Sequence, residues 1–249
     1  MAKTDHHLST KTTIGCLMPA LIPDLEHLFV VLNAAHTYYL TNEPFSRKGK
    51  AHRAQIRSAS QSQWLTLPVL SEDKKKPIRH VRINQNINWP EAFMKVLQVN
   101  YGNSRFYDFY QPEIRADFEH AAGLTYLTDI IFYLNERISR YLEITSLLEN
   151  RISRVSTAGF QEQLKTHHSN NEPLIQIEQR GSYYRKIDSC GYGLIREVDF
   201  EHPIYRQPWG DFFAGCSVLD LLFQYGPYSY QIIGKLQPDN SHKKSTGDA

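Results

Sequence analysis

Apolar residues along this chain recur at two spacings, one suited to buried strands and one suited to helices. Short apolar runs at residues 13–18 and 37–40 predict two strands. Residues 25–35, between these strands, carry apolar side chains at helical spacing and predict a helix. Residues 54–57 and 63–70 flank a polar turn and predict a β-hairpin. These elements predict a chain that mixes strands and helices from its first part onward.

Two further elements are expected before the middle of the chain. Residues 78–83 alternate apolar and cationic side chains, which predicts a strand with cationic groups on both faces. Asn88 followed by Pro90 predicts the start of a helix, because Asn caps a first turn and Pro fits within it. The helix is expected to end at Gly102, since Gly favours a helix terminus.

The strongest helical pattern of all spans residues 124–148, where apolar residues recur every three or four positions as one stripe. Residues 151–171 are polar and are expected to be exposed. A last helix is expected to begin at Ser217, with Asp220 completing a near variant of the capping box. Gly226, followed by proline, is expected to end that helix.

The pattern as a whole predicts an α/β or α+β protein. We expect a mixed sheet with flanking helices in the N-terminal part and a helical C-terminal part. Residues 13–237 are long enough to bury a core and are assigned to one domain. Residues 1–12 and 238–249 are polar and rich in Lys, His, Ser and Thr, so they are expected to be disordered tails.

The charges are distributed unevenly. The formal net charge is only +2, but residues 44–82 hold ten Lys or Arg against two acids, a local charge of +8 that leaves −6 for the rest. Such asymmetry steers anions to one face, whereas the weak total argues against a general nucleic-acid coat. With three cysteines, no apolar leader and no long apolar run, the chain is expected to be cytoplasmic.

Residues 45–57, here called the cationic segment, form the most informative feature. Five of these thirteen residues are Arg or Lys, and no acid occurs between Pro44 and Ser71. Their guanidinium and ammonium groups, with backbone donors at Ser46 and Gly49, are suited to holding a phosphate. A solubilising loop is the alternative explanation of this charge run.

Other candidates are weighed in the same way. His202 lies in an X-Pro turn before the last helix; it is the one candidate catalytic group, although a hydrogen-bonded turn is the preferred explanation. Cys216 precedes a helix, which favours a thiolate, but small buried cysteines are commoner. The aromatic residues 106–110 suit a packed helix corner better than a stacking platform. The scattered histidines predict no metal site, and no cofactor is indicated.

Several segments together resemble the WbqC-like family, and the resemblance extends over about residues 14–233. The cationic segment and residues 64–69, Trp-Leu-Thr-Leu-Pro-Val, match in order and spacing. Next in the match come residues 81–89, followed by Tyr101 and two later aromatic residues. The closing motifs are His-Pro-Ile-Tyr-Arg-Gln at 202–207 and Ser-Val-Leu-Asp-Leu-Leu-Phe-Gln-Tyr-Gly-Pro at 217–227.

The chain departs from the family pattern near its start. The family's first strand usually ends in His-Gln-Pro-x-x-x-Pro followed by Trp. Here Leu17 and Met18 stand at the His and Gln positions, while Pro19 and Pro23 are retained. The acidic pair that precedes the cationic segment in relatives is replaced by Thr-Asn at residues 41–42. The chain therefore keeps the basic half of the family's expected site and lacks the half that carries histidine.

The resemblance implies a role in the biosynthesis of bacterial surface polysaccharide of the O-antigen type. The expected ligand is a sugar nucleotide or phosphorylated sugar, and an active enzyme would be a transferase acting on a sugar nucleotide or amino sugar. Other polysaccharide-biosynthesis enzymes are the expected partners, and a non-catalytic binding or scaffold protein is the alternative. Phosphate is assigned to Arg47, Lys48, Arg53 and Arg57, and stacking or positioning to Trp64 and Tyr205.

Overall fold

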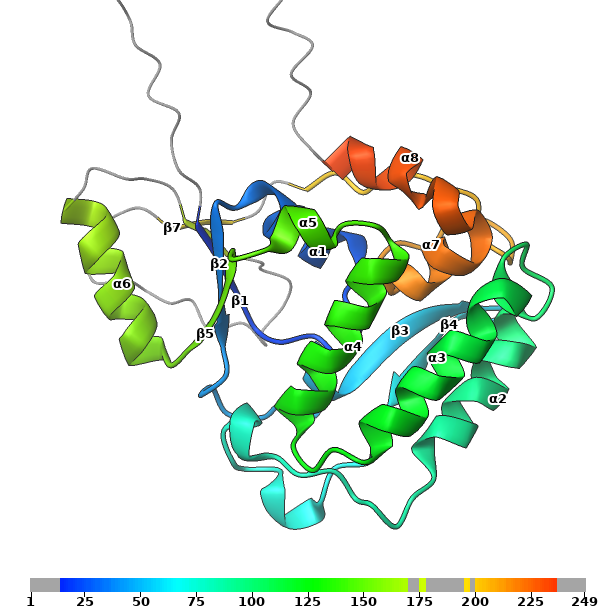
Figure 1. Ribbon diagram of the computed structural model, residues 1–249, viewed down its shortest axis with the longest axis horizontal. Helices are drawn as coiled ribbons and strands as arrows, with labels where there is room; N and C mark the ends of the chain where they lie inside the picture. The colour runs from blue at the N-terminus through cyan, green and yellow to red at the C-terminus, as the bar shows by residue number, and fades with distance from the viewer. Residues whose placement is uncertain (1–13, 170–174, 178–194, 198–199, 237–249) are drawn as a thin grey trace, which may run out of the picture.

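A computed structural model describes residues 14–169, 175–177, 195–197 and 200–236 (Figure 1). The two tails predicted to be disordered, 1–12 and 238–249, lie outside the described residues. The described part contains a parallel sheet, a separate hairpin and several helices, and it confirms the predicted α/β class.

The central sheet has five strands in the order β5-β2-β1-β6-β7, and every neighbouring pair is parallel. Both predicted N-terminal strands belong to it. The antiparallel strands form a second sheet of their own, so parallel and antiparallel pairs are not combined in one sheet. The five strands are β1 (Ile14–Leu17), β2 (His36–Leu40), β5 (Ile152–Val155), β6 (Ile175–Ile177) and β7 (Ile195–Glu197).

Helices cover both faces of the parallel sheet (Figure 1). Helix α1 (Leu25–Asn33) connects β1 to β2, and helix α6 (Thr157–Ser169) connects β5 to β6. Because successive strand residues point to opposite faces, Tyr39 packs with the residues of α1 whereas Tyr38 packs against Phe160 of α6. This arrangement is doubly wound: the strand order reverses at β1, between β2 on one side and β6 on the other.

Gly15 lets α1 approach the sheet closely. A Cβ atom at this position would lie 2.8 Å from the Thr37 hydroxyl and 3.0 Å from a methyl carbon of Val30. Both distances are shorter than ordinary packing contacts, so no larger residue fits without displacing the helix.

An inserted unit, residues 41–151, connects β2 to β5. It holds the antiparallel hairpin and four helices, whose apolar faces form most of the largest core cluster. In Figure 1 the hairpin lies beside the helices of this unit, away from α6. Its elements are β3 (Arg53–Ser58), β4 (Gln61–Thr66), α2 (Trp89–Tyr101), α3 (Tyr107–Ala122), α4 (Leu127–Tyr141), α5 (Thr145–Leu148) and the 3₁₀ helices η1 (Lys50–His52), η2 (Ser71–Asp73) and η3 (Ile78–His80).

Local sequence signals predicted some of these helix boundaries correctly. The Asn88 side chain accepts a hydrogen bond from the Glu91 backbone N–H, and Gly102 caps the end of α2, as predicted. The pattern over 124–148 instead forms two helices, because Glu143 takes a left-handed φ of 59° after α4 ends. Helix α3, with Pro112 inside it, was not predicted.

Two predictions about polar segments are wrong. Residues 78–83 do not form a strand: they begin with η3 and continue into isolated bridges at Arg82 and Ile83. Residues 151–171 are not simply exposed, because they contain β5 and α6. Phe160 of α6 is fully buried against the parallel sheet.

The C-terminal elements are α7 (Val218–Tyr225), η4 (Gly226–Ser229), α8 (Tyr230–Ile233) and η5 (Gly234–Leu236). They pack onto both parts of the protein: α7 contacts the hairpin and α3, whereas the last turn contacts α1. Helix α7 begins and ends where predicted, but the expected capping box is absent. The Ser217 side chain makes no capping bond, and Asp220 is directed into the core instead.

Candidate functional site

The cationic segment lies against the loop that leaves the carboxyl end of β1. The Leu21 N–H donates to the Lys50 carbonyl over 2.9 Å, and Lys50 Nζ lies 2.8 Å from the Asp24 carboxylate. Asp24 also caps α1 by accepting a hydrogen bond from the His27 N–H. The cationic segment is thus bonded, through Lys50, to the loop that connects β1 to α1.

Residues 46–49 form a turn that is closed by its own hydrogen bonds. The Gly49 N–H donates to the Ser46 carbonyl, and the Lys48 N–H donates to the Ser46 hydroxyl. The Gly49 N–H expected to hold phosphate is therefore already occupied. The side chains of Arg47 and Lys48 are exposed and pair with no acid among the described residues.

Arg53 and Trp64 form a stacked pair on the hairpin. The guanidinium carbon of Arg53 lies 4.0 Å from the centre of the Trp64 ring, and the guanidinium also donates to the carbonyls of Lys48 and Gly49. Trp64 remains 37% exposed. The pair joins the turn at 46–49 to β4 and presents a flat aromatic surface beside positive charge.

Arg57 lies apart from this surface. It is only 5% exposed, and its guanidinium donates to the carbonyls of Ser58, Gln61, Trp209 and Asp211. These bonds fasten the hairpin to the loop that precedes α7. Because its donors are directed at backbone carbonyls inside the protein, the Arg57 guanidinium is not available to a ligand at the surface.

His202 and Tyr205 occupy the turn before α7. The His202 Nδ1 atom lies 3.1 Å from the Pro203 carbonyl, and its Nε2 atom accepts a hydrogen bond from the Gly215 N–H over 3.4 Å. Tyr205 is buried, which raises the pKa of its phenol well above the ordinary value. Burial likewise raises the pKa of the Cys216 thiol, so a thiolate is disfavoured there.

Asp220 is the centre of a buried polar network that the sequence did not reveal. Its carboxylate accepts hydrogen bonds from the Tyr101 hydroxyl and the Gln207 amide, each over 3.0 Å, and it is also bonded to Tyr205. Burial raises the pKa of Asp220 to about 6. The sequence around Ser217 predicted that this carboxylate would cap the helix. Its role in the buried network is identified only by its tertiary contacts.

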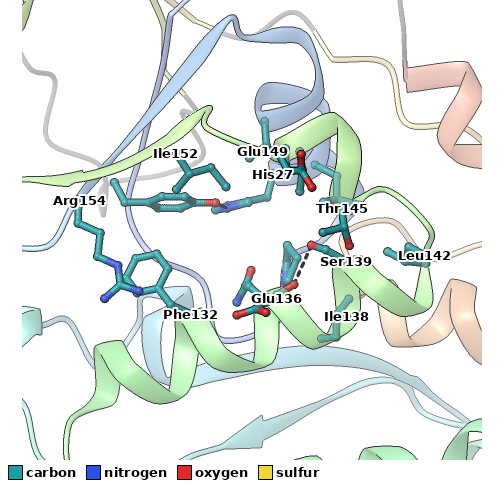
Figure 2. Close-up of a pocket in the computed structure, with 16 residues that line it drawn as sticks. His27, Phe132, Glu136, Ile138, Ser139, Leu142, Thr145, Glu149, Ile152 and Arg154 are labelled. Atoms are coloured by element: carbon teal, nitrogen blue, oxygen red, sulfur yellow. Dashed lines mark hydrogen bonds between the residues drawn. The ribbon is translucent and has the colours of Figure 1, made fainter.

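A cavity of about 310 Å³ lies between the parallel sheet and the helices of the inserted unit (Figure 2). Helices α1, α4 and α5 and strands β2 and β5 all contribute to its wall. His27 and Tyr39 meet there, with His27 Nε2 2.7 Å from the Tyr39 hydroxyl. The cavity is lined by none of the residues to which the sequence assigned a role, namely Arg47, Lys48, Arg53, Arg57, Trp64, His202 and Tyr205.

These features define a doubly wound α/β protein with a cationic segment at the carboxyl edge of its first strand. The chain belongs to the WbqC-like protein family, which matches residues 19–232. No curated protein and no solved structure matches it at a significant level. The described residues include no cluster of three or more potential metal ligands, and no helix among them has the length and apolarity to span a membrane.

Proposed function

We propose that the protein binds a sugar nucleotide or phosphorylated sugar at the carboxyl edge of β1, and so supports a transfer or modification step in surface-polysaccharide biosynthesis. One observation carries the proposal: the Leu21–Lys50 hydrogen bond holds the cationic segment against the loop that follows β1, the strand at which the strand order reverses. Ligands of doubly wound proteins bind at this edge. Membership of the WbqC-like family supports the polysaccharide context.

In this proposal each residue of the exposed surface has a separate role. Arg47 and Lys48 carry exposed charges without acidic partners among the described residues, so they would neutralise phosphate. The Arg53–Trp64 pair would position a base or sugar ring by stacking on the indole. Tyr205 is too deeply buried to touch a ligand at this surface and would act only by supporting the turn before α7.

Binding of UDP-N-acetylglucosamine can be measured by calorimetry for the native chain and the Arg47→Ala/Lys48→Ala variant. We expect the double variant to bind at least about tenfold more weakly, because hydrogen bonds to charged groups contribute about 1.5–3 kcal/mol each. Affinity in the native chain should also fall as salt is raised. Equal affinity in both proteins would remove the phosphate role.

Lys235→Ala is the matched control. Lys235 is exposed, and its neighbour Leu236 accepts a hydrogen bond from Asn33 at the opposite end of α1. Removing this charge alters the net charge of the protein without touching the proposed site. The control should therefore keep the native affinity.

A second candidate, binding without turnover, is favoured by the residues at the end of β1. Leu17 is 1% exposed and packs under α1, and the half-buried Met18 contacts two core clusters. Neither side chain can transfer a proton, whereas the family resemblance implies His and Gln at these positions, which directly precede the matched residues 19–232. Release of nucleotide from UDP-N-acetylglucosamine by the native chain would exclude this candidate. Release gained only in the Leu17→His/Met18→Gln variant would support it.

A further inference from the structure

The cavity in Figure 2 has mainly apolar walls and charged residues at its mouth. Leu28 and Val31 of α1 and Ile138 of α4 are among its buried walls. The charged residues of its lining, Glu136, Glu149 and Arg154, are exposed and therefore mark the opening. At 310 Å³ the space is at the lower end of the range in which proteins bind small molecules.

The charges at the mouth favour neither an anion nor a cation. Glu136 is paired with Arg140 on the same helix, at 2.5 Å, and Arg154 stacks on the ring of Phe132, at 3.8 Å. Below this rim the lining has no Asp, Glu, Lys or Arg, and its one histidine, His27, is already bonded to the Tyr39 hydroxyl. A charged ligand would lose its hydration on entry without gaining an opposite charge, so the interior selects a neutral one.

The interior also has specific polar groups, placed on two adjoining helices. The Thr145 hydroxyl is buried and has no hydrogen-bond partner among the described residues. On α4, the Ser139 hydroxyl donates to the Asn135 carbonyl, which leaves its own lone pairs able to accept. Figure 2 shows Thr145 and Ser139 on the same side of the cavity. Buried hydroxyls are ordinarily bonded, so the Thr145 hydroxyl indicates a missing partner.

Aromatic rings form the opposite part of the wall. Tyr39 and Phe132 contact each other edge to face, with ring centres 5.4 Å apart and an angle of 80° between the rings. Arg154 stacks on Phe132 and His27 stacks on Tyr39, so an apolar ring between the sheet and α4 would contact the remaining faces and edges of these two rings. We propose that this cavity binds a neutral ring compound that carries a hydroxyl group, an arene or cyclic alcohol, with the hydroxyl bonded to Thr145 and Ser139.

Three probes of similar shape separate the requirements. Toluene supplies only the ring, p-cresol adds a hydroxyl, and p-toluate adds a negative charge. In methyl NMR spectra we expect p-cresol to shift the signals of Leu28, Val31 and Ile138 with a dissociation constant on the order of millimolar. Toluene should bind more weakly at the same signals, and p-toluate should not bind.

Two variants test the residues. Thr145→Val keeps the shape but removes the hydroxyl, so p-cresol should bind about fivefold more weakly while toluene is unaffected. Ser139→Leu places a larger side chain in the space and should abolish binding of both probes. If Ser139→Leu fails to fold, Thr145→Val still decides the matter. Equal binding of toluene and p-cresol to the native chain, binding of p-toluate, or shifts confined to other methyl groups would overturn the proposal.

Discussion

The hydroxyl of Tyr101 on α2 donates to the carboxylate of Asp220 on α7 over 3.0 Å, and the same hydroxyl accepts the backbone N–H of Arg57 over 2.9 Å. One phenol therefore links the hairpin, the inserted helices and the C-terminal helix. Because all three groups are buried, none of these bonds can be replaced by water without opening the core.

Replacing Tyr101 by Phe should destabilise the protein by about 1–3 kcal/mol, since the substitution leaves the Asp220 carboxylate and the Arg57 N–H without their shared partner. Urea unfolding gives the free energy of unfolding directly. Tyr228→Phe is the control: that ring is 46% exposed, and its change should stay within about 0.5 kcal/mol. Equal effects in both variants would show that the buried phenol contributes nothing beyond packing.

Asp220 should make stability fall as pH rises. Its pKa is raised from 3.8 to about 6, chiefly by burial, so between these values the folded chain holds a proton that the unfolded chain has lost. The contribution is complete below pH 4 and is lost by about pH 6, a change of about 3 kcal/mol. From pH 4 to 7 the free energy of unfolding of the native chain should therefore fall relative to that of the Asp220→Asn variant. A difference independent of pH would contradict this.

His52 should act in the opposite direction. Burial, aided by the charge of Arg53, lowers the pKa of this imidazole from 6.5 to about 4. Between these two pH values the imidazole is protonated in the unfolded chain but neutral in the folded chain. The free energy of unfolding should therefore fall by about 3 kcal/mol as the pH is lowered from 6.5 to 4. His52→Gln should flatten this acid limb in a series of urea unfolding curves. The exposed His80→Gln should leave it as steep as in the native chain.

Gly226→Ala should destabilise the protein by about 2–4 kcal/mol. Gly226 has φ of 51° and ψ of −125°, and a Cβ there would lie 2.5 Å from the ring of Phe106. Gly234→Ala is the matched control, because no neighbouring atom lies within 4 Å of its added Cβ. Thermal unfolding of the two variants should give a large shift for the first and almost none for the second.

Local signals in the sequence explain what could be predicted of the fold. The cap at Asn88, the stop at Gly102 and the apolar runs of β1 and β2 depend on neighbouring residues, and each was located correctly. Residues 78–83 misled because alternation also arises when Ile78 and Val81 reach the core from a 3₁₀ turn and its extension. Strand β5 was missed because only its pairing with β2 makes it a strand.

The candidate site shows the same division. Arg53 and Trp64 were both chosen from the sequence, but their stacking depends on the register of the hairpin, which no short pattern specifies. Arg57 looked equivalent to Arg53 in the cationic segment, yet the loop at 209–211 covers Arg57 and not Arg53. The cavity between α1, α4 and β5 has no local signature, since its wall is assembled from distant segments.

The inserted unit also has a consequence for how the chain is made. Strands β2 and β5 are paired from Thr37 with Ile152 to Leu40 with Val155, but residues 41–151 separate them. During synthesis β1, α1 and β2 emerge long before β5 exists, and the cost of closing so long a loop delays their pairing further. The β2 edge of a half-made chain therefore stays open, and we expect it to be the point at which nascent chains associate with one another or meet a chaperone.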